Sequence, residues 1–196
     1  MKKKIIGIVS ICILGMGMCA CYSRENAVQK TELEEQTPDS PQKTNIDFVN
    51  KEIDIPDLSK QYKLIIVNDQ HVIVANGDYV ADKSEEINQR IALFSDADGK
   101  TSSETWPEIV DAINVEKPDG VILNGDMVDF FSEANLNCLM DGVKRIDAPV
   151  MYNRVDHDLG IWYSDTYTDE DVQQREKKAW EMEDVMVQDF DEFIVV

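Results

Sequence analysis

Three short clusters of acidic residues and histidines give this chain its candidate chemistry. They are Asp69-Gln70-His71, the segment from Gly125 to Asp129, and Asp156-His157-Asp158. Hard divalent cations prefer carboxylate oxygen, and imidazole suits zinc, iron or manganese. An aspartate and a histidine two residues apart on a loop can therefore face one metal ion. The chain has 2 histidines, and both lie in these clusters.

Each cluster follows an apolar run that predicts a buried strand. The runs are Tyr62–Asn68, Asp119–Asn124 and Pro149–Tyr152. Apolar residues at helical spacing predict helices between them, and these are Ser84–Ser95, Glu104–Glu116 with Pro107 in its first turn, and Ser132–Ile146. This alternation favours an α/β domain with parallel central strands covered by helices. The three clusters should then meet at the carboxyl ends of the strands, where such sheets bind ligands.

The sequence after the third cluster contributes two further expected elements. A long, highly charged segment from Thr168 to Asp189 predicts a helix, and Phe193–Val196 begins a predicted strand. Trp162 and Tyr163, just after the third cluster, are candidates for lining a pocket.

The three clusters resemble the motifs of the calcineurin-like metallophosphoesterase family. Asp69-x-His71 and Gly125-Asp126-x-x-Asp129 match two motifs, and Val155 to Asp158 is an altered Gly-Asn-His-Asp. The resemblance covers roughly Tyr62 to Leu159. It implies an α/β fold that is the N-terminal half of a metallophosphoesterase β-sandwich, with α/β/β/α layers, incomplete at the C-terminus.

The resemblance also implies a set of metal ligands. Asp69 and His71 would bind a first metal, Asp126 would bridge two metals, and Asp156 would bind the second. The cofactors would be two divalent ions, manganese, iron or zinc. Ions about 4 Å apart lower the pKa of a shared water, and the resulting hydroxide attacks the phosphorus of a phosphate mono- or diester.

Four further residues receive roles from the same resemblance. His157 would be catalytic, facing the scissile phosphate and stabilising or protonating the leaving group. Asp129 and Asp158 would orient the ligands. Arg154 could offset the charge of Asp156 or contact phosphate.

Three departures from the family pattern bear on activity. Val155 replaces a glycine, and a β-branched residue resists a positive φ, which indicates a reshaped loop. Asp156 replaces an asparagine and adds a negative charge. No histidine follows His157, whereas the family completes its site with later histidines. We therefore expect a phosphoesterase in truncated form with an incomplete metal site; the alternative is a non-catalytic cell-surface lipoprotein that binds a partner or a single metal ion.

The N-terminus has the pattern of an export signal. Lys2, Lys3 and Lys4 precede the apolar segment Ile5–Met18. The stretch Met18-Cys19-Ala20-Cys21 resembles a bacterial lipobox and predicts lipidation at Cys21; an ordinary secretory signal is the alternative. The protein would then be exported and anchored by lipid to the outer face of the cell membrane.

Composition divides the remaining chain and limits its partners. Residues 1–20 form the expected signal, residues 21–45 a polar, disordered tether, and residues 46–196 the metallophosphoesterase domain. After processing at Cys21, Cys138 would be the only free thiol, which excludes a disulfide framework. The net charge of −20 disfavours nucleic acid as a partner, while a phosphate ester remains the expected substrate.

Overall fold

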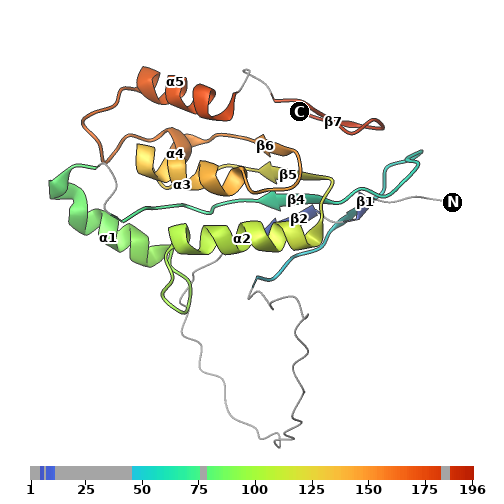
Figure 1. The fold of residues 1–196 in the computed structure, drawn as a ribbon, viewed down its shortest axis with the longest axis horizontal. Coiled ribbons are helices and arrows are strands. Elements are labelled where there is room, and N and C mark those ends of the chain that lie inside the picture. The colour runs from blue at the N-terminus through green and yellow to red at the C-terminus, as the bar shows by residue number, and fades with distance from the viewer. Residues whose placement is uncertain (1–4, 7, 12–45, 76–78, 182–185) are drawn as a thin grey trace, which may run out of the picture.

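A parallel sheet of four strands lies at the centre of the fold (Figure 1). The computed structural model describes residues 5–6, 8–11, 46–75, 79–181 and 186–196. The strand order is β2-β4-β5-β6, and every neighbouring pair is parallel. The strands are β2 (Ile8–Ile11), β4 (Leu64–Val67), β5 (Gly120–Leu123) and β6 (Val150–Tyr152). The three strands predicted from apolar runs, their parallel pairing and the mixed α/β class are confirmed.

Three helices connect these strands in the predicted order. They are α1 (Ser84–Leu93), which follows the short 3₁₀ turn η1 (Ala81–Lys83), α2 (Ser102–Glu116) and α3 (Glu133–Val143). Ser132 caps α3 by accepting a hydrogen bond from the backbone N–H of Asn135 at 3.1 Å. Such a cap satisfies a donor that would otherwise lack a partner at the helix start.

One face of the sheet packs against α2 and α3 to form the main core. Alternate strand residues point to this face, including Ile65, Val67, Val121 and Leu123, all of which are buried. Between the two helices lies Trp106, fully buried, whose indole N–H donates to the carbonyl of Leu139 at 3.1 Å. A Cβ added to Gly142 would lie 2.0 Å from the Trp106 indole nitrogen. Glycine at this position therefore permits the close approach of α3 to α2.

Helix α2 begins earlier than the sequence pattern indicated. It starts at Ser102 rather than Glu104, because the Glu104 carboxylate accepts a hydrogen bond from the backbone N–H of Thr101 at 2.8 Å and closes a capping box. Pro107 consequently lies inside the helix and not in its first turn. The Ser103 carbonyl, which an N–H at position 107 would otherwise reach, is approached by the Cys138 thiol at 4.0 Å.

The C-terminal segment differs from its prediction. Helix α5 spans Asp169–Trp180 and does not continue to Asp189, because Glu181 turns into the left-handed region with φ of 51°. Strand β7 (Gln188–Asp189) then pairs with β8 (Ile194–Val195) in an antiparallel hairpin, so the predicted strand at Phe193–Val196 is confirmed. The Tyr62 hydroxyl donates to the Phe190 carbonyl at 2.8 Å and joins the hairpin to the start of β4.

Part of the expected signal segment is paired in the structure. Strand β1 (Ile5–Ile6) lies antiparallel to β3 (Glu52–Ile53), and β2 occupies the sheet edge beside β4. Cys21 and the expected tether of residues 21–45 lie outside the described residues, so the signal, its cleavage and lipidation stay predictions. Among the helices that the structure describes, none has both the length and the apolar character needed to cross a membrane.

Candidate metal centre

The polar residues that end the three central strands meet at one edge of the sheet. A row of asparagines joins them: the Asn153 side-chain amide donates to Asn124 at 3.4 Å, and the Asn124 amide donates to Asn68 at 2.9 Å. The arrows of β4 and β5 point toward this edge, where α1 and α4 (Asp156–Leu159) lie (Figure 1). The predicted meeting of the three clusters is thus observed.

The loop after β4 is held against the loop after β5 by backbone hydrogen bonds. The N–H of Asp69 donates to the Gly125 carbonyl at 3.2 Å, and the N–H of His71 donates to the Asp126 carbonyl at 2.8 Å. Asp69, His71 and Asp126 all have positive φ, at 53°, 46° and 51°. Left-handed backbone costs a non-glycine residue roughly 1–2 kcal/mol, and such strain concentrates at functional sites.

These same three residues turn their ligand atoms toward one another. The nearest carboxylate oxygens of Asp69 and Asp126 and a ring nitrogen of His71 all lie within 4.8 Å of one another. The His71 Nε2 atom lies 3.9 Å from Asp126 Oδ2. The other oxygen of Asp126, Oδ1, is buried and has no hydrogen-bond partner in the described part of the chain. A buried carboxylate oxygen without a partner is costly, and a divalent cation would satisfy it. The residues therefore fit a cation.

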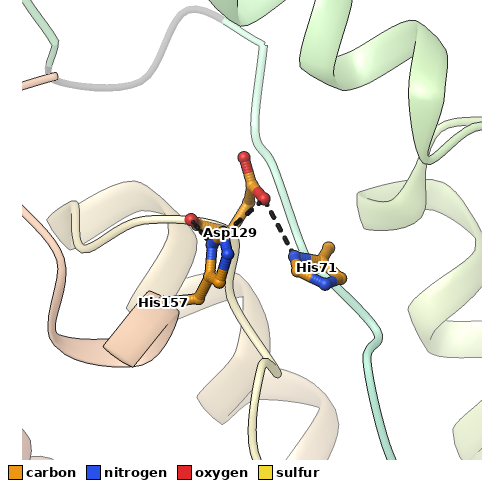
Figure 2. Close-up of side chains that lie close together, drawn as sticks. All are labelled: His71, Asp129 and His157. Atoms are coloured by element: carbon orange, nitrogen blue, oxygen red, sulfur yellow. Dashed lines mark hydrogen bonds and ion pairs between the residues drawn. The ribbon is translucent and has the colours of Figure 1, made fainter. Parts of the chain in front are cut away.

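Asp129 fixes the orientation of His71 (Figure 2). The Nδ1 atom of His71 lies 2.8 Å from Asp129 Oδ1, and the imidazole stacks on the Phe94 ring with centroids 4.0 Å apart. A carboxylate accepts the Nδ1 proton, so Nε2 carries the lone pair that a metal ion needs. His71 is buried at 7 % exposure, which leaves its ring little freedom to turn.

Arg90 on α1 is a member of this site that the sequence motifs did not reveal. Its Nε donates to Asp129 Oδ2 at 2.9 Å, and its Nη2 donates to Asp129 Oδ1 at 2.5 Å. Burial raises the pKa of Asp129, but Arg90 and His71 outweigh this effect and lower it below the ordinary value. In the sequence, Arg90 lies among the apolar residues Ile87, Ile91 and Phe94 of one helical stripe. A charged residue on such a stripe points toward the protein interior, and this position could have indicated that Arg90 has a buried partner.

His157 shares Asp129 with His71. Its Nδ1 atom lies 2.7 Å from the Asp129 carbonyl oxygen, and its ring meets the His71 ring edge-on with centroids 4.8 Å apart (Figure 2). The His71–Asp129–His157 group also has metal-ligand composition. However, the paired guanidinium of Arg90 already neutralises Asp129, so this group is a hydrogen-bonded support and a poorer cation site than Asp69, His71 and Asp126.

The ring of Trp162 borders His157 on the solvent side. The two ring centroids are 5.0 Å apart, and Trp162 is 52 % exposed. Tyr163 instead packs edge-on against Phe130, with centroids 4.8 Å apart. Of these two candidates for lining a pocket, Trp162 is the one next to a site residue.

Asp158 holds the loop that carries Asp126. Its Oδ1 accepts hydrogen bonds from the N–H groups of Met127 at 2.8 Å and Val128 at 3.1 Å. Its Oδ2 accepts from Asp126 and from Val155, both at 3.0 Å. Because Asp158 is fully buried, the three bonds from Asp126, Met127 and Val128 fix the loop firmly.

The remaining residues of the third motif are placed differently from one another. Asp156 to Asp158 lie on the short helix α4 and not on a loop. Val155 is extended, with φ of −130°, so this position needs no glycine. Asp156 is exposed, and it lies outside both groups of described residues whose atoms could hold a cation. The Nη1 atom of Arg154 is buried and has no hydrogen-bond partner in the same part of the chain.

Comparison of the chain with family models, curated proteins and solved structures found no match. Two carboxylates and one oriented imidazole nitrogen suit manganese, iron or zinc, and a second histidine stands beside them.

Proposed function

We propose that Asp69, His71 and Asp126 hold a divalent cation, and that this cation site is one half of a metal-dependent phosphoesterase centre. The observation that carries the proposal is the convergence of one ligand atom from each of these residues within 4.8 Å. The second oxygen of Asp126, Oδ1, supports it, because this atom is buried and has no hydrogen-bond partner among the described residues. A divalent cation in such a site polarises a phosphoryl oxygen and lowers the pKa of a bound water.

The protein's own groups have defined tasks in this proposal. Asp129 holds the rings of both histidines by their Nδ1 atoms, which leaves the Nε2 atom of His157 available to a leaving-group oxygen. Asp158 keeps Asp126 in place through the loop amides. The reaction is the hydrolysis of a phosphate ester by water, in which a monoester yields inorganic phosphate and an alcohol, and a diester yields a phosphate monoester and an alcohol. The substrate would lie outside the cytoplasm if the chain is exported and lipid-anchored at Cys21.

The proposal includes the sandwich architecture that the motif resemblance implies. The sheet face opposite α2 and α3 bears the half-buried Ile66 and Ile122 and borders a cavity of about 600 Å³. An apolar sheet face of this kind suits packing against a second layer.

A second candidate function is the binding of a single metal ion without catalysis, as in a cell-surface lipoprotein. Asp156 favours it, because this expected ligand of the second metal is exposed and does not belong to the group of atoms that Asp69, His71 and Asp126 bring within 4.8 Å of one another. The two groups of described residues that could hold a cation share His71, and the Asp69, His71 and Asp126 group is the better of the two.

Titration with Mn²⁺ by calorimetry, followed by an assay with a chromogenic phosphate ester, tests both candidates. We expect Mn²⁺ binding that Asp126→Asn abolishes. The matched control is Asp147→Asn, an exposed aspartate that precedes β6 at the opposite end of the sheet and should leave binding unchanged. Binding with Mn²⁺-dependent hydrolysis would support the phosphoesterase, binding without hydrolysis the single-ion function, and no binding would exclude both.

A further inference from the structure

A second group of buried polar side chains lies between β6, α4 and α5, apart from the candidate cation ligands. Its central member is Glu176 on α5, which is 0 % exposed. Neither carboxyl oxygen of Glu176 makes a hydrogen bond of normal geometry in the described part of the chain. The same is true of three other buried atoms, which are the Tyr152 hydroxyl, Arg154 Nη1 and Trp180 Nε1. Buried polar atoms without partners are rare, so several in one place indicate a specific role.

These side chains form one cluster together with Asp158. The rings of Tyr152 and Trp180 stack with centroids 4.3 Å apart, which joins β6 to α5. Glu176 feels the charges of both Asp158 and Arg154, and Tyr152 feels those of Asp158 and Glu176. A change in the charge of Glu176 therefore changes the electrostatic energy of Asp158, which holds the loop of Asp126.

Burial raises the pKa of the Asp158 carboxyl group, but the hydrogen bonds that it accepts from backbone N–H groups oppose this effect and favour its charged form. Each of its two oxygens already accepts two backbone N–H groups, so all the positions where a carboxyl proton would lie are occupied by donors. Arg154 supplies one positive charge nearby. One carboxylate and one guanidinium balance, and a second buried negative charge would have no counterion.

Glu176 is therefore the group that must stay neutral. Burial, together with the nearby charge of Asp158, raises the pKa of Glu176 to about 8. Below that pH its carboxyl group is protonated and can donate a hydrogen bond within the cluster. The Trp180 indole, on the same helix, can only donate, whereas the Tyr152 hydroxyl can accept.

We propose that Glu176 is a positioning residue, whose neutral carboxyl group leaves Asp158 as the only negative charge of the buried cluster and so keeps the loop of Asp126 in place. The proposal rests on the proposed function only in one respect, which is that the loop carries a cation ligand, Asp126. Ionisation of Glu176 adds a charge that repels Asp158. Among the described residues, the charged and titratable groups that face Glu176 from the elements around it are Asp158, Arg154 and Tyr152.

Amide hydrogen exchange of the metal-free protein, followed by NMR at pH 6.5 to 9.5, tests this role. The readout is the protection of the amides of Asp126, Met127 and Val128, each corrected for its intrinsic exchange rate at each pH. In the wild-type protein we expect this protection to fall on the order of tenfold as the pH rises through about 8. Glu176→Gln, which is neutral at every pH, should keep it. Glu170→Gln, an exposed position on the same helix, should behave as wild type.

The result that overturns the proposal is equal behaviour of wild type and Glu176→Gln, whether both lose protection or both keep it. The amides of Ile109 and Val110 in α2 serve as a reference, and an equal loss there would mean general unfolding and would also overturn it. Because no cation is present, failure of Mn²⁺ binding would count against the proposed function and not against the role of Glu176.

Discussion

Asp129 is the residue on which both histidines of the candidate site depend. It is fully buried, its carboxylate bonds His71 and Arg90, and its carbonyl bonds His157. The guanidinium of Arg90 keeps this carboxylate ionised despite burial, so the carboxylate accepts a hydrogen bond from His71 Nδ1 and the proton stays on the imidazole. Arg90 thus acts on the cation site through two intermediate side chains.

Asp129→Asn should weaken cation binding without removing any proposed ligand. An amide of the same shape is a weaker acceptor for His71 Nδ1, so the imidazole loses its fixed tautomer and orientation. Loss of such a supporting carboxylate typically costs 10- to 100-fold in metal affinity, and we expect Mn²⁺ affinity measured by calorimetry to fall by about that factor.

Asp111→Asn is the matched control for that experiment. It also removes the aspartate partner of an arginine, Arg145, but on the surface between α2 and the segment after α3. Its Mn²⁺ affinity should equal that of wild type. Unchanged affinity in Asp129→Asn, with the same thermal stability as the control, would show that Asp129 does not orient a ligand.

At the scale of elements, the loop after β5 is shaped by two close approaches. Gly125 has φ of 88°, and a Cβ added there would lie 2.7 Å and 2.9 Å from the two methyl carbons of Val155. The extended Val155 therefore packs over the loop at the place where the motif resemblance implied a glycine. The third motif accommodates a β-branched residue because Gly125 provides the space.

Gly125→Ala should destabilise the protein for two separable reasons. The left-handed backbone costs about 1 kcal/mol, and the contact with Val155 adds about 1–3 kcal/mol of overpacking. Gly99→Ala is the matched control, because Gly99 has φ of 84° and no atom within 4 Å of an added Cβ. Urea denaturation should show a larger loss for Gly125→Ala than for Gly99→Ala. An equal decrease in the free energy of unfolding for both variants would mean that the contact with Val155 contributes no overpacking.

The elements also show which features the sequence could predict. Strands β4, β5 and β6 and helices α1 to α3 follow from local apolar patterns, and so does the placement of Asp69, His71 and Asp126 at strand ends. The end of α5 could not be predicted in this way, because no glycine or proline marks it. Phe190, farther along the chain, packs with Tyr62 and Leu64, and this tertiary contact overrides the local helical pattern. The pairing of Arg90 with Asp129 joins residues far apart in the chain, which no local pattern reports.

In the whole molecule, the expected signal segment overlaps with the central sheet, because residues of the expected signal form a strand of that sheet. Ile8–Ile11 form β2, which adds one edge strand to the three strands that carry the site. The candidate ligands all follow β4 and β5, and the supporting Asp158 follows β6. Cleavage before Cys21 would remove β2 and leave each of these strands and loops in the chain, so export and the cation site are compatible.

Lipid anchoring at Cys21 gives the last prediction. When the full chain is expressed in a bacterial host, metabolic labelling with a fatty acid should mark the product that begins at Cys21, and this product should lie in the membrane fraction, because a diacylated N-terminus provides stable attachment. Cys21→Ser should abolish the label and release the protein from membranes. Cys19→Ser is the matched control, since the bulky Met18 precedes this nearby cysteine, and it should stay labelled. A label that follows Cys19, or membrane association that survives Cys21→Ser, would contradict the assignment of Cys21.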